Sequence, residues 1–136
     1  GTRDEFCDYI DTESNEFTYR LCSYKGSAAA VRLAKEINNP FVSVMETFHS
    51  GPLGTVYSGI DISESNIIVT AYKEAQDKNG YILRAYECEG KRTNARISLF
   101  VQSIDINVEF SPFEIKTFRI LDDGRYEPTD LKEDSI

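Results

Sequence analysis

Residues 67–87, IIVTAYKEAQDKNGYILRAYE, decide the fold of this chain. β-Branched and aromatic residues dominate residues 67–72 and recur in residues 81–87, and the dipeptide Asn79-Gly80 precedes the second run. Asn-Gly between two such runs is a strong signal for an antiparallel β-hairpin. The linker is longer than two residues, which leaves the type of turn open. The stretch therefore predicts two antiparallel strands joined by a turn.

Further short runs on both sides of this hairpin predict more strands. In residues 16–24 apolar and polar residues alternate, with Phe17, Tyr19 and Leu21 on one face, as in a half-buried strand. Turn residues such as Ser111-Pro112 separate the runs. Strands are expected at residues 16–24, 41–48, 56–62, 67–72, 81–87, 95–101, 104–110 and 115–121.

Residues 28–37 predict one short helix, because apolar residues recur there with a helical period. Ser27 is expected to cap its N-terminus, and Pro40 follows its end. About eight strands and one helix predict a mainly β chain, an antiparallel β-sandwich over residues 16–121. From residue 122 onward the periodicity is lost, so residues 122–136 are expected to be an acidic C-terminal tail on a surface or disordered.

The net charge of −8 belongs to the two ends of the chain. The first 16 residues hold six acids against one base, and the last 15 hold six acids against two bases, which leaves the middle at +1. A near-neutral body has no basic stripe to neutralise phosphates, so we expect no nucleic-acid partner. No apolar run approaches 18 residues, so we expect no transmembrane helix and no membrane partner.

The cysteines indicate a reducing compartment. Cys7, Cys22 and Cys88 are odd in number, far apart and without CxxC spacing, which argues against a disulfide framework. The start of the chain lacks the apolar region of a signal peptide, and the sequence has no Asn-x-Ser/Thr sequon. A cytoplasmic location is therefore expected.

The residues themselves predict no catalytic, cofactor or metal site in this chain. The one histidine, His49, lies beside a Gly-Pro turn, where a surface or hydrogen-bonding role is favoured over catalysis. Asp105, Asn107 and Glu109 share one strand face, but their alternation with apolar residues favours a solvated face over a metal site. Asp122-Asp123-Gly124 lacks the other ligands of a calcium loop and predicts a turn. No spacing selects a pair of acids for glycoside hydrolysis.

Four stretches, in this order, carry the pattern of a known family: EFTYRL at 16–21 with LAKEINNP at 33–40, HSGPL at 49–53, IIVTAYKEAQD at 67–77 with GYILRAYE at 80–87, and FEIKTF at 113–118. Together they resemble the C-terminal β-sandwich domain of a glycoside hydrolase family 38 α-mannosidase of the bacterial type. Gln76 stands where that family commonly has Glu, and Cys88 stands where Pro or Asn is frequent.

The resemblance implies a non-catalytic part of a longer enzyme. Family 38 enzymes are retaining α-mannosidases that hydrolyse terminal α-mannosides. Their nucleophile and a divalent metal, usually zinc, lie in an N-terminal barrel-like domain. The expected partner is therefore the rest of the α-mannosidase chain, with a homo-oligomer as a further prediction. Residues 1–15 are expected to be the end of a preceding module or a linker.

Within the strongest match, Lys73, Asp77, Arg84 and Glu87 are candidates for docking the sandwich on the catalytic domain. In this hypothesis Arg84 packs against that domain. If Lys73, Arg84 and Glu87 share a face, they form a hydrogen-bonded ion network. In the alternative, Arg84 and Glu87 pair on a solvated sheet face, which is worth about 0–1 kcal/mol.

A second class of function stays open at this point, a stand-alone carbohydrate-binding or adhesion β-sandwich. The 8 Tyr and 8 Phe supply rings for stacking on sugars. However, several of the tyrosines fall within predicted strands, where packing is the default, and Trp is absent. An autonomous glycosidase is least favoured, because 136 residues leave no room for the family's catalytic domain.

Overall fold

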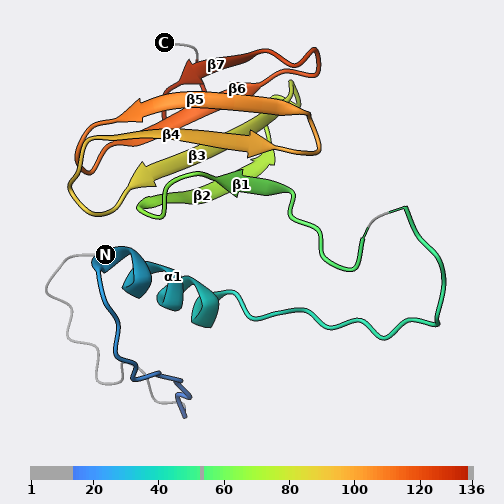
Figure 1. Ribbon diagram of the computed structural model, residues 1–136, viewed down its shortest axis with the longest axis vertical. Helices are drawn as coiled ribbons and strands as arrows, with labels where there is room; N and C mark the ends of the chain where they lie inside the picture. The colour runs from blue at the N-terminus through green and yellow to red at the C-terminus, as the bar shows by residue number, and fades with distance from the viewer. Residues whose placement is uncertain (1–13, 53, 135–136) are drawn as a thin grey trace, which may run out of the picture.

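The computed structural model describes residues 14–52 and 54–134 (Figure 1). Within those residues the chain forms one helix and seven strands, and every strand pair is antiparallel. The elements are α1 (Ser27–Asn38), β1 (Ile60–Ile62), β2 (Ile67–Glu74), β3 (Tyr81–Glu87), β4 (Thr93–Leu99), β5 (Ile104–Phe110), β6 (Ile115–Ile120) and β7 (Tyr126–Thr129). The mainly β class predicted from the sequence is confirmed.

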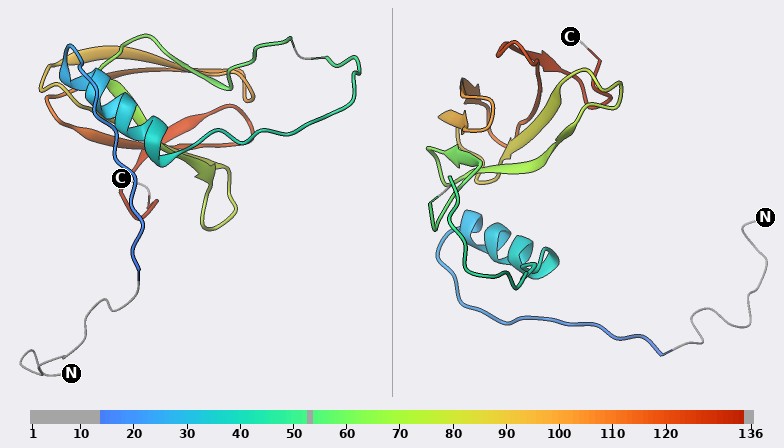
Figure 2. Two further views of the ribbon diagram at one scale, coloured as in Figure 1. Left: turned by 90° about the horizontal axis from the view of Figure 1, so that it is seen from below. Right: turned by 90° about the vertical axis from the view of Figure 1, so that its right-hand side faces the viewer.

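Two sheets face each other across one core. One sheet has the strand order β1-β4-β5 and the other has the order β2-β3-β6-β7, and Figure 2 shows the two sheets curving around the space between them. Every second residue of a strand points into that space, because successive side chains of a strand point to opposite sides of the sheet. The core cluster consists of Ile67, Leu83, Ala85, Ala95, Ile97, Leu99, Ile104, Ile106, Phe110, Phe118 and Ile120.

In strand β5, buried apolar residues alternate with exposed polar residues. Ile104, Ile106 and Phe110 are buried, whereas Asp105, Asn107 and Glu109 are exposed. Ser98 donates to Asp105, and Arg92 forms an ion pair with Glu109 at 2.7 Å. The predicted solvated face is therefore confirmed for these three polar residues.

The hairpin of β2 and β3 forms where the Asn-Gly signal predicts it. Its connection is closed by the Ala75 N–H, which donates to the Gly80 carbonyl at 2.9 Å. Gly80 has a φ of +84°, and a Cβ atom there would lie 2.2 Å from the Ile120 carbonyl oxygen. Only glycine suits both the left-handed backbone and this close approach to β6. A register shift between Val69 and Ala71 marks an irregularity in β2.

Helix α1 lies beside the sandwich and is tied to it by three polar contacts. Arg32 donates to the Ser65 carbonyl at 3.0 Å, and Lys35 donates to the Val69 carbonyl. The Ala28 N–H contacts Glu89 Oε1 at 3.4 Å. The predicted helix is confirmed, but Ser27 is its first residue and Gly26, which has no side chain to cap the helix, takes the N-cap position.

Two of the predicted strands are wrong for this chain. Residues 16–24 and 41–48 run as irregular, exposed backbone, and of residues 56–62 only Ile60–Ile62 form a strand (Figure 1). A strand needs the N–H and C=O groups of a neighbour. Within the described part of the chain no strand pairs with either segment.

The predicted acidic tail contains a strand that the sequence pattern does not indicate. Strand β7 pairs with β6 at the edge of its sheet, with Thr129 opposite Thr117. Pro128 is compatible with an edge strand because its missing N–H is not needed on the open side. Residues 130–134 then form a turn, in which the Asp130 N–H donates to the Asp134 carbonyl at 2.9 Å.

Several sequence-based expectations fall wholly or partly outside the described residues. Residues 1–13, which include Cys7 and most of the expected linker, lie outside the described residues. Cys22 is exposed and Cys88 is half-buried, and both are free thiols. In residues 14–52 and 54–134 the single helix is too short to cross a membrane.

Candidate functional site

A cluster of basic side chains lies on the outer face of the four-stranded sheet, away from the core. The register places Lys73 on β2 opposite Ile82 on β3, and Ile82 opposite Arg119 on β6. It also places Arg84 opposite Thr117, two pairs further along and therefore on the same face. Directly opposed residues point to the same face of a sheet. Lys73, Arg84 and Arg119 therefore form one group, here called the outer basic cluster.

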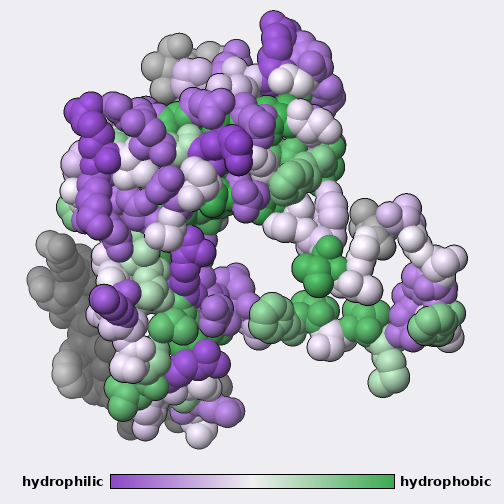
Figure 3. All heavy atoms as spheres, viewed as in Figure 1, coloured by the Kyte–Doolittle hydropathy of each residue, from purple (hydrophilic) through white to green (hydrophobic). Residues whose placement is uncertain are grey.

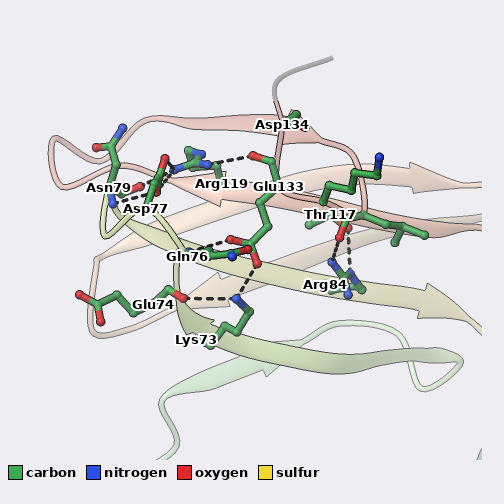
Figure 4. Close-up of polar contacts among 12 residues, drawn as sticks. Lys73, Glu74, Gln76, Asp77, Asn79, Arg84, Thr117, Arg119, Glu133 and Asp134 are labelled. Atoms are coloured by element: carbon green, nitrogen blue, oxygen red, sulfur yellow. Dashed lines mark hydrogen bonds and ion pairs between the residues drawn. The ribbon is translucent and has the colours of Figure 1, made fainter.

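The C-terminal turn, residues 130–134, lies over this cluster (Figure 4). Lys73 Nζ is 2.5 Å from Glu133 Oε1, and the Gln76 N–H donates to Glu133 Oε2 at 2.8 Å. These two bonds, the one from Lys73 first, lower the pKa of Glu133. Arg84 Nη2 donates to the Leu131 carbonyl at 3.0 Å. The cluster therefore holds the end of the chain on the sheet.

Arg119 is the most buried member of the outer basic cluster and joins three segments. Its Nη1 atom donates to both carboxylate oxygens of Asp77, at 2.8 and 3.0 Å, and to the Asn79 carbonyl at 2.8 Å. Its Nη2 atom donates to the Glu133 carbonyl at 2.8 Å. The Arg119 side chain lowers the pKa of Asp77. One guanidinium therefore fixes the β2–β3 turn and the C-terminal turn to β6.

Glu87 lies on the opposite side of the sheet and is fully buried. Its carboxylate accepts hydrogen bonds from Asn66 Nδ2 at 2.8 Å and from the N–H of Phe113 at 3.0 Å. The N–H groups of Glu89, Gly90 and Lys91 donate to it at 2.7, 2.7 and 3.1 Å.

These five hydrogen bonds keep the Glu87 carboxylate ionised. Burial by itself raises the pKa of a carboxyl group, but here the bonds from Phe113, Asn66, Glu89 and Lys91 outweigh it and lower the pKa to about 2. The bonds also tie the β3–β4 loop and the β5–β6 loop to the end of β3. The role of Glu87 in the sandwich is therefore to hold these loops in place.

The position of Glu87 corrects two expectations about Arg84. Glu87 lies three residues after Arg84, so on a regular strand the two side chains point to opposite faces. Hence Glu87 belongs neither to an ion network with Lys73 and Arg84 nor to a surface pair with Arg84. Arg84 instead donates from Nε to Thr117 Oγ1 at 3.1 Å and from Nη2 to the Leu131 carbonyl. The structure brings Lys73, Asp77 and Arg84 to one face and leaves Glu87 elsewhere, and their role in docking stays a prediction.

Three polar residues of these two sites were missed by the sequence reasoning. Arg119 could have been found from the alternation of β6, which places it on the same face as Thr117. Asn66, which also donates to Thr93 Oγ1 at 2.7 Å, directly precedes β2 and belongs to no periodic pattern or motif of the sequence. Glu133 lies in the segment expected to be a tail, and no sequence signal ties it to Lys73.

The remaining candidates for chemistry are dispersed. His49 is exposed, and its Nδ1 atom is 3.1 Å from the Ser50 carbonyl oxygen. Asp123 pairs with Arg125 in the turn between β6 and β7, as a turn was predicted there. Among residues 14–52 and 54–134, no three His, Cys, Asp or Glu side chains are placed to hold a metal ion.

Comparison with known proteins agrees with the observed architecture. Two packed antiparallel sheets define the chain as a β-sandwich protein. Residues 66–107 match the model of the glycosyl hydrolases family 38 C-terminal beta sandwich domain. They run from just before β2 to within β5. The resemblance to a family 38 C-terminal β-sandwich domain that the sequence predicts is therefore confirmed over these residues. The bacterial type stays a prediction.

The chain is also similar to one part of a much longer protein. It is 28% identical to Alpha-mannosidase G of Dictyostelium discoideum, over 84% of this chain and 13% of that protein. The chain therefore spans about an eighth of the length of this curated relative. No solved structure matches the chain.

Proposed function

We propose that this chain is a non-catalytic β-sandwich module of an α-mannosidase, whose full-length chain hydrolyses terminal α-mannosides. The observation that carries the proposal is the match of residues 66–107 to the family 38 C-terminal domain. The similarity to Alpha-mannosidase G supports the substrate class. The zinc ion and the catalytic carboxylates of the enzyme lie in another domain in this proposal.

The geometry of the charged residues supports a structural role for the module. A glycosidase places two carboxyl groups across the scissile bond, where each is free to act on the sugar. The Glu87 carboxylate is buried under five hydrogen bonds, and Asp77 is bound to Arg119 through both oxygens. These groups hold loops, so the module supports the rest of the enzyme as its partner. Its cytoplasmic location also stays a prediction.

The test compares the full-length enzyme with the 136-residue chain. The full-length enzyme is expected to hydrolyse an aryl α-mannoside, whereas the 136-residue chain hydrolyses none and binds no mannose in calorimetry. Hydrolysis by the 136-residue chain would contradict the non-catalytic role. A full-length enzyme without activity on α-mannosides would contradict the substrate class, and micromolar mannose binding by the chain would favour a carbohydrate-binding module.

A further inference from the structure

Two segments outside the sandwich expose large apolar side chains. In residues 17–21 the apolar members are Phe17, Tyr19 and Leu21, and each is at least 80% exposed. In residues 41–48 they are Phe41, Val42, Val44, Met45 and Phe48, and each is again at least 80% exposed. Figure 3 shows hydrophobic side chains along the segment that projects from the sandwich between α1 and β1. So many exposed large apolar side chains in two short segments indicate an interaction site.

The sequence of these segments is that of strands and not that of a flexible linker. Linkers are rich in Gly, Ser and Pro, whereas residues 17–21 alternate apolar and polar side chains. Residues 41–48 carry apolar side chains on both strand faces, since Phe41 and Met45 fall on one and Val44 and Phe48 on the other. This is the pattern of a strand covered on both sides. The first segment has the pattern of a strand covered on one side.

The similarity to the α-mannosidase reaches into the part of the chain that precedes the sandwich. The sandwich, from residue 60 onward, is little more than half of the 136 residues, whereas the similarity to Alpha-mannosidase G covers 84% of them. The aligned region must therefore extend into the residues before β1. Because this chain corresponds to 13% of that relative, most of the relative lies outside the similarity. In a full-length chain of similar length, the additional residues could supply strands that pair with these two segments.

We propose that residues 17–22 and 41–48 are two β-strands of the full-length enzyme, paired with strands from a part of the same polypeptide outside these 136 residues. This proposal rests on the proposed function. Main-chain hydrogen bonds to the partner strands satisfy the backbone, and the apolar faces pack into a second core. Helix α1 connects the two strands and is fixed to the sandwich through Arg32 and Lys35, so this second core lies next to the sandwich.

Hydrogen–deuterium exchange of the full-length enzyme and of the 136-residue chain tests the proposal. In the 136-residue chain the amides of residues 17–22 and 41–48 are expected to exchange at the rate of an unstructured peptide. In the full-length enzyme their exchange is expected to slow by at least about a hundredfold. Strand β3 is the internal control, because it lies in the centre of its sheet and is protected in both proteins.

Two outcomes would overturn the proposal. Fast exchange of both segments in the full-length enzyme would show that they are not strands. Slow exchange in the 136-residue chain would show that the partner lies within this chain, or in a second copy if the protection grows with concentration. Activity on the aryl α-mannoside is measured on the same full-length sample, so a failure of the proposed function is seen separately from the exchange result.

A pair of variants in the full-length enzyme tests the predicted faces. Tyr19→Asp places a charge on the apolar face and is expected to speed exchange at residues 17–22 and 41–48 at least tenfold. Thr18→Asp, on the opposite face, is the matched control and leaves the exchange unchanged. Equal effects of the two variants would contradict the assignment of faces. If Tyr19→Asp fails to fold, the comparison of the two wild-type proteins still decides the proposal.

Discussion

At the scale of single residues, Glu87 shows how a buried charge stabilises the sandwich. Five N–H groups converge on its two oxygens, so the carboxylate replaces its lost water with hydrogen bonds. In Glu87→Gln the amide nitrogen faces at least two of these N–H groups in either orientation. We expect a loss of about 3 kcal/mol in the free energy of unfolding, measured by urea denaturation. Glu109→Gln, which loses one exposed ion pair with Arg92, is the control and costs under about 1 kcal/mol.

The same residue predicts how stability depends on pH. The pKa of Glu87 is about 2 in the folded chain and about 4.5 in the unfolded chain. A carboxyl group with a lowered folded pKa stabilises the fold above pH 4.5, and this contribution is lost as the pH falls toward 2. The difference in unfolding free energy between wild type and Glu87→Gln should therefore be constant near neutral pH and shrink below pH 4.5. A difference that grows with acid would contradict the ionised state of Glu87.

Two glycines with the same positive φ allow the cost of backbone strain to be measured separately from the cost of a steric clash. Gly80 and Gly124 both have a φ of +84°, but a Cβ atom at Gly80 would lie 2.2 Å from the Ile120 carbonyl oxygen, whereas Gly124 has open space. Gly124→Ala should cost about 1 kcal/mol for the left-handed conformation alone. Gly80→Ala should cost at least about 2 kcal/mol more, because β6 has to move. Equal losses in thermal unfolding would contradict the close approach of the hairpin turn to β6.

At the scale of elements, the sequence predicts β2 to β6, whose partners lie in the described part of the chain, but it does not predict β7. The expected ranges 81–87 and 104–110 coincide with β3 and β5, and the ranges for β2, β4 and β6 differ by a few residues at their ends. Residues 16–24 and 41–48 have the same alternating or apolar character and yet form no strand here. Periodicity reports which side chains share a face, but it carries no information on whether a partner strand is present.

The candidate site was less predictable because it depends on pairing between distant elements. The match to the family pointed to Lys73, Asp77 and Arg84, yet their partners Thr117, Arg119 and Glu133 come from β6 and from the C-terminal turn. Residues 122–136 are acidic and without periodicity, which is the composition of a solvated tail. Within residues 122–134, order comes from the pairing of β7 with β6 and from the outer basic cluster, which binds the Glu133 carboxylate and two backbone carbonyl groups of the C-terminal turn.

The C-terminal turn gives a prediction at this same scale. In Glu133→Ala, Lys73 and the Gln76 N–H lose their acceptor, so residues 130–134 should detach from the sheet more often. We expect faster amide exchange at residues 126–134 and a melting temperature lower by a few degrees. Asp134→Ala changes an exposed neighbour and serves as the control. Unchanged exchange in Glu133→Ala would mean that the Glu133 side chain does not hold this segment, which would then depend on the carbonyl bonds to Arg84 and Arg119 and on the pairing of β7 with β6.

At the scale of the whole molecule, the sandwich is bound together on both sides of its four-stranded sheet. On the inner side Glu87 holds the loops next to the core, and on the outer side the outer basic cluster holds the C-terminal turn. Among the acidic side chains of residues 122–134, Glu133 is buried against the outer basic cluster, whereas Asp122, Asp123 and Asp134 are exposed. These contacts agree with the supporting role that is proposed for the module.

A variant of Arg84 tests whether the outer face of the four-stranded sheet also contacts the rest of the enzyme. Arg84→Ala removes the bonds to Thr117 and Leu131, so the 136-residue chain should lose a few degrees of melting temperature. If Arg84 also docks on the catalytic domain, the full-length enzyme should lose activity on the aryl α-mannoside, and its loss of melting temperature should be larger than that of the chain. Thr117→Val, which removes one internal partner of Arg84 and leaves Arg84 itself in place, is the matched control. Unchanged activity, with equal losses of melting temperature in both proteins, would contradict docking through Arg84 and leave it an internal contact of the sandwich.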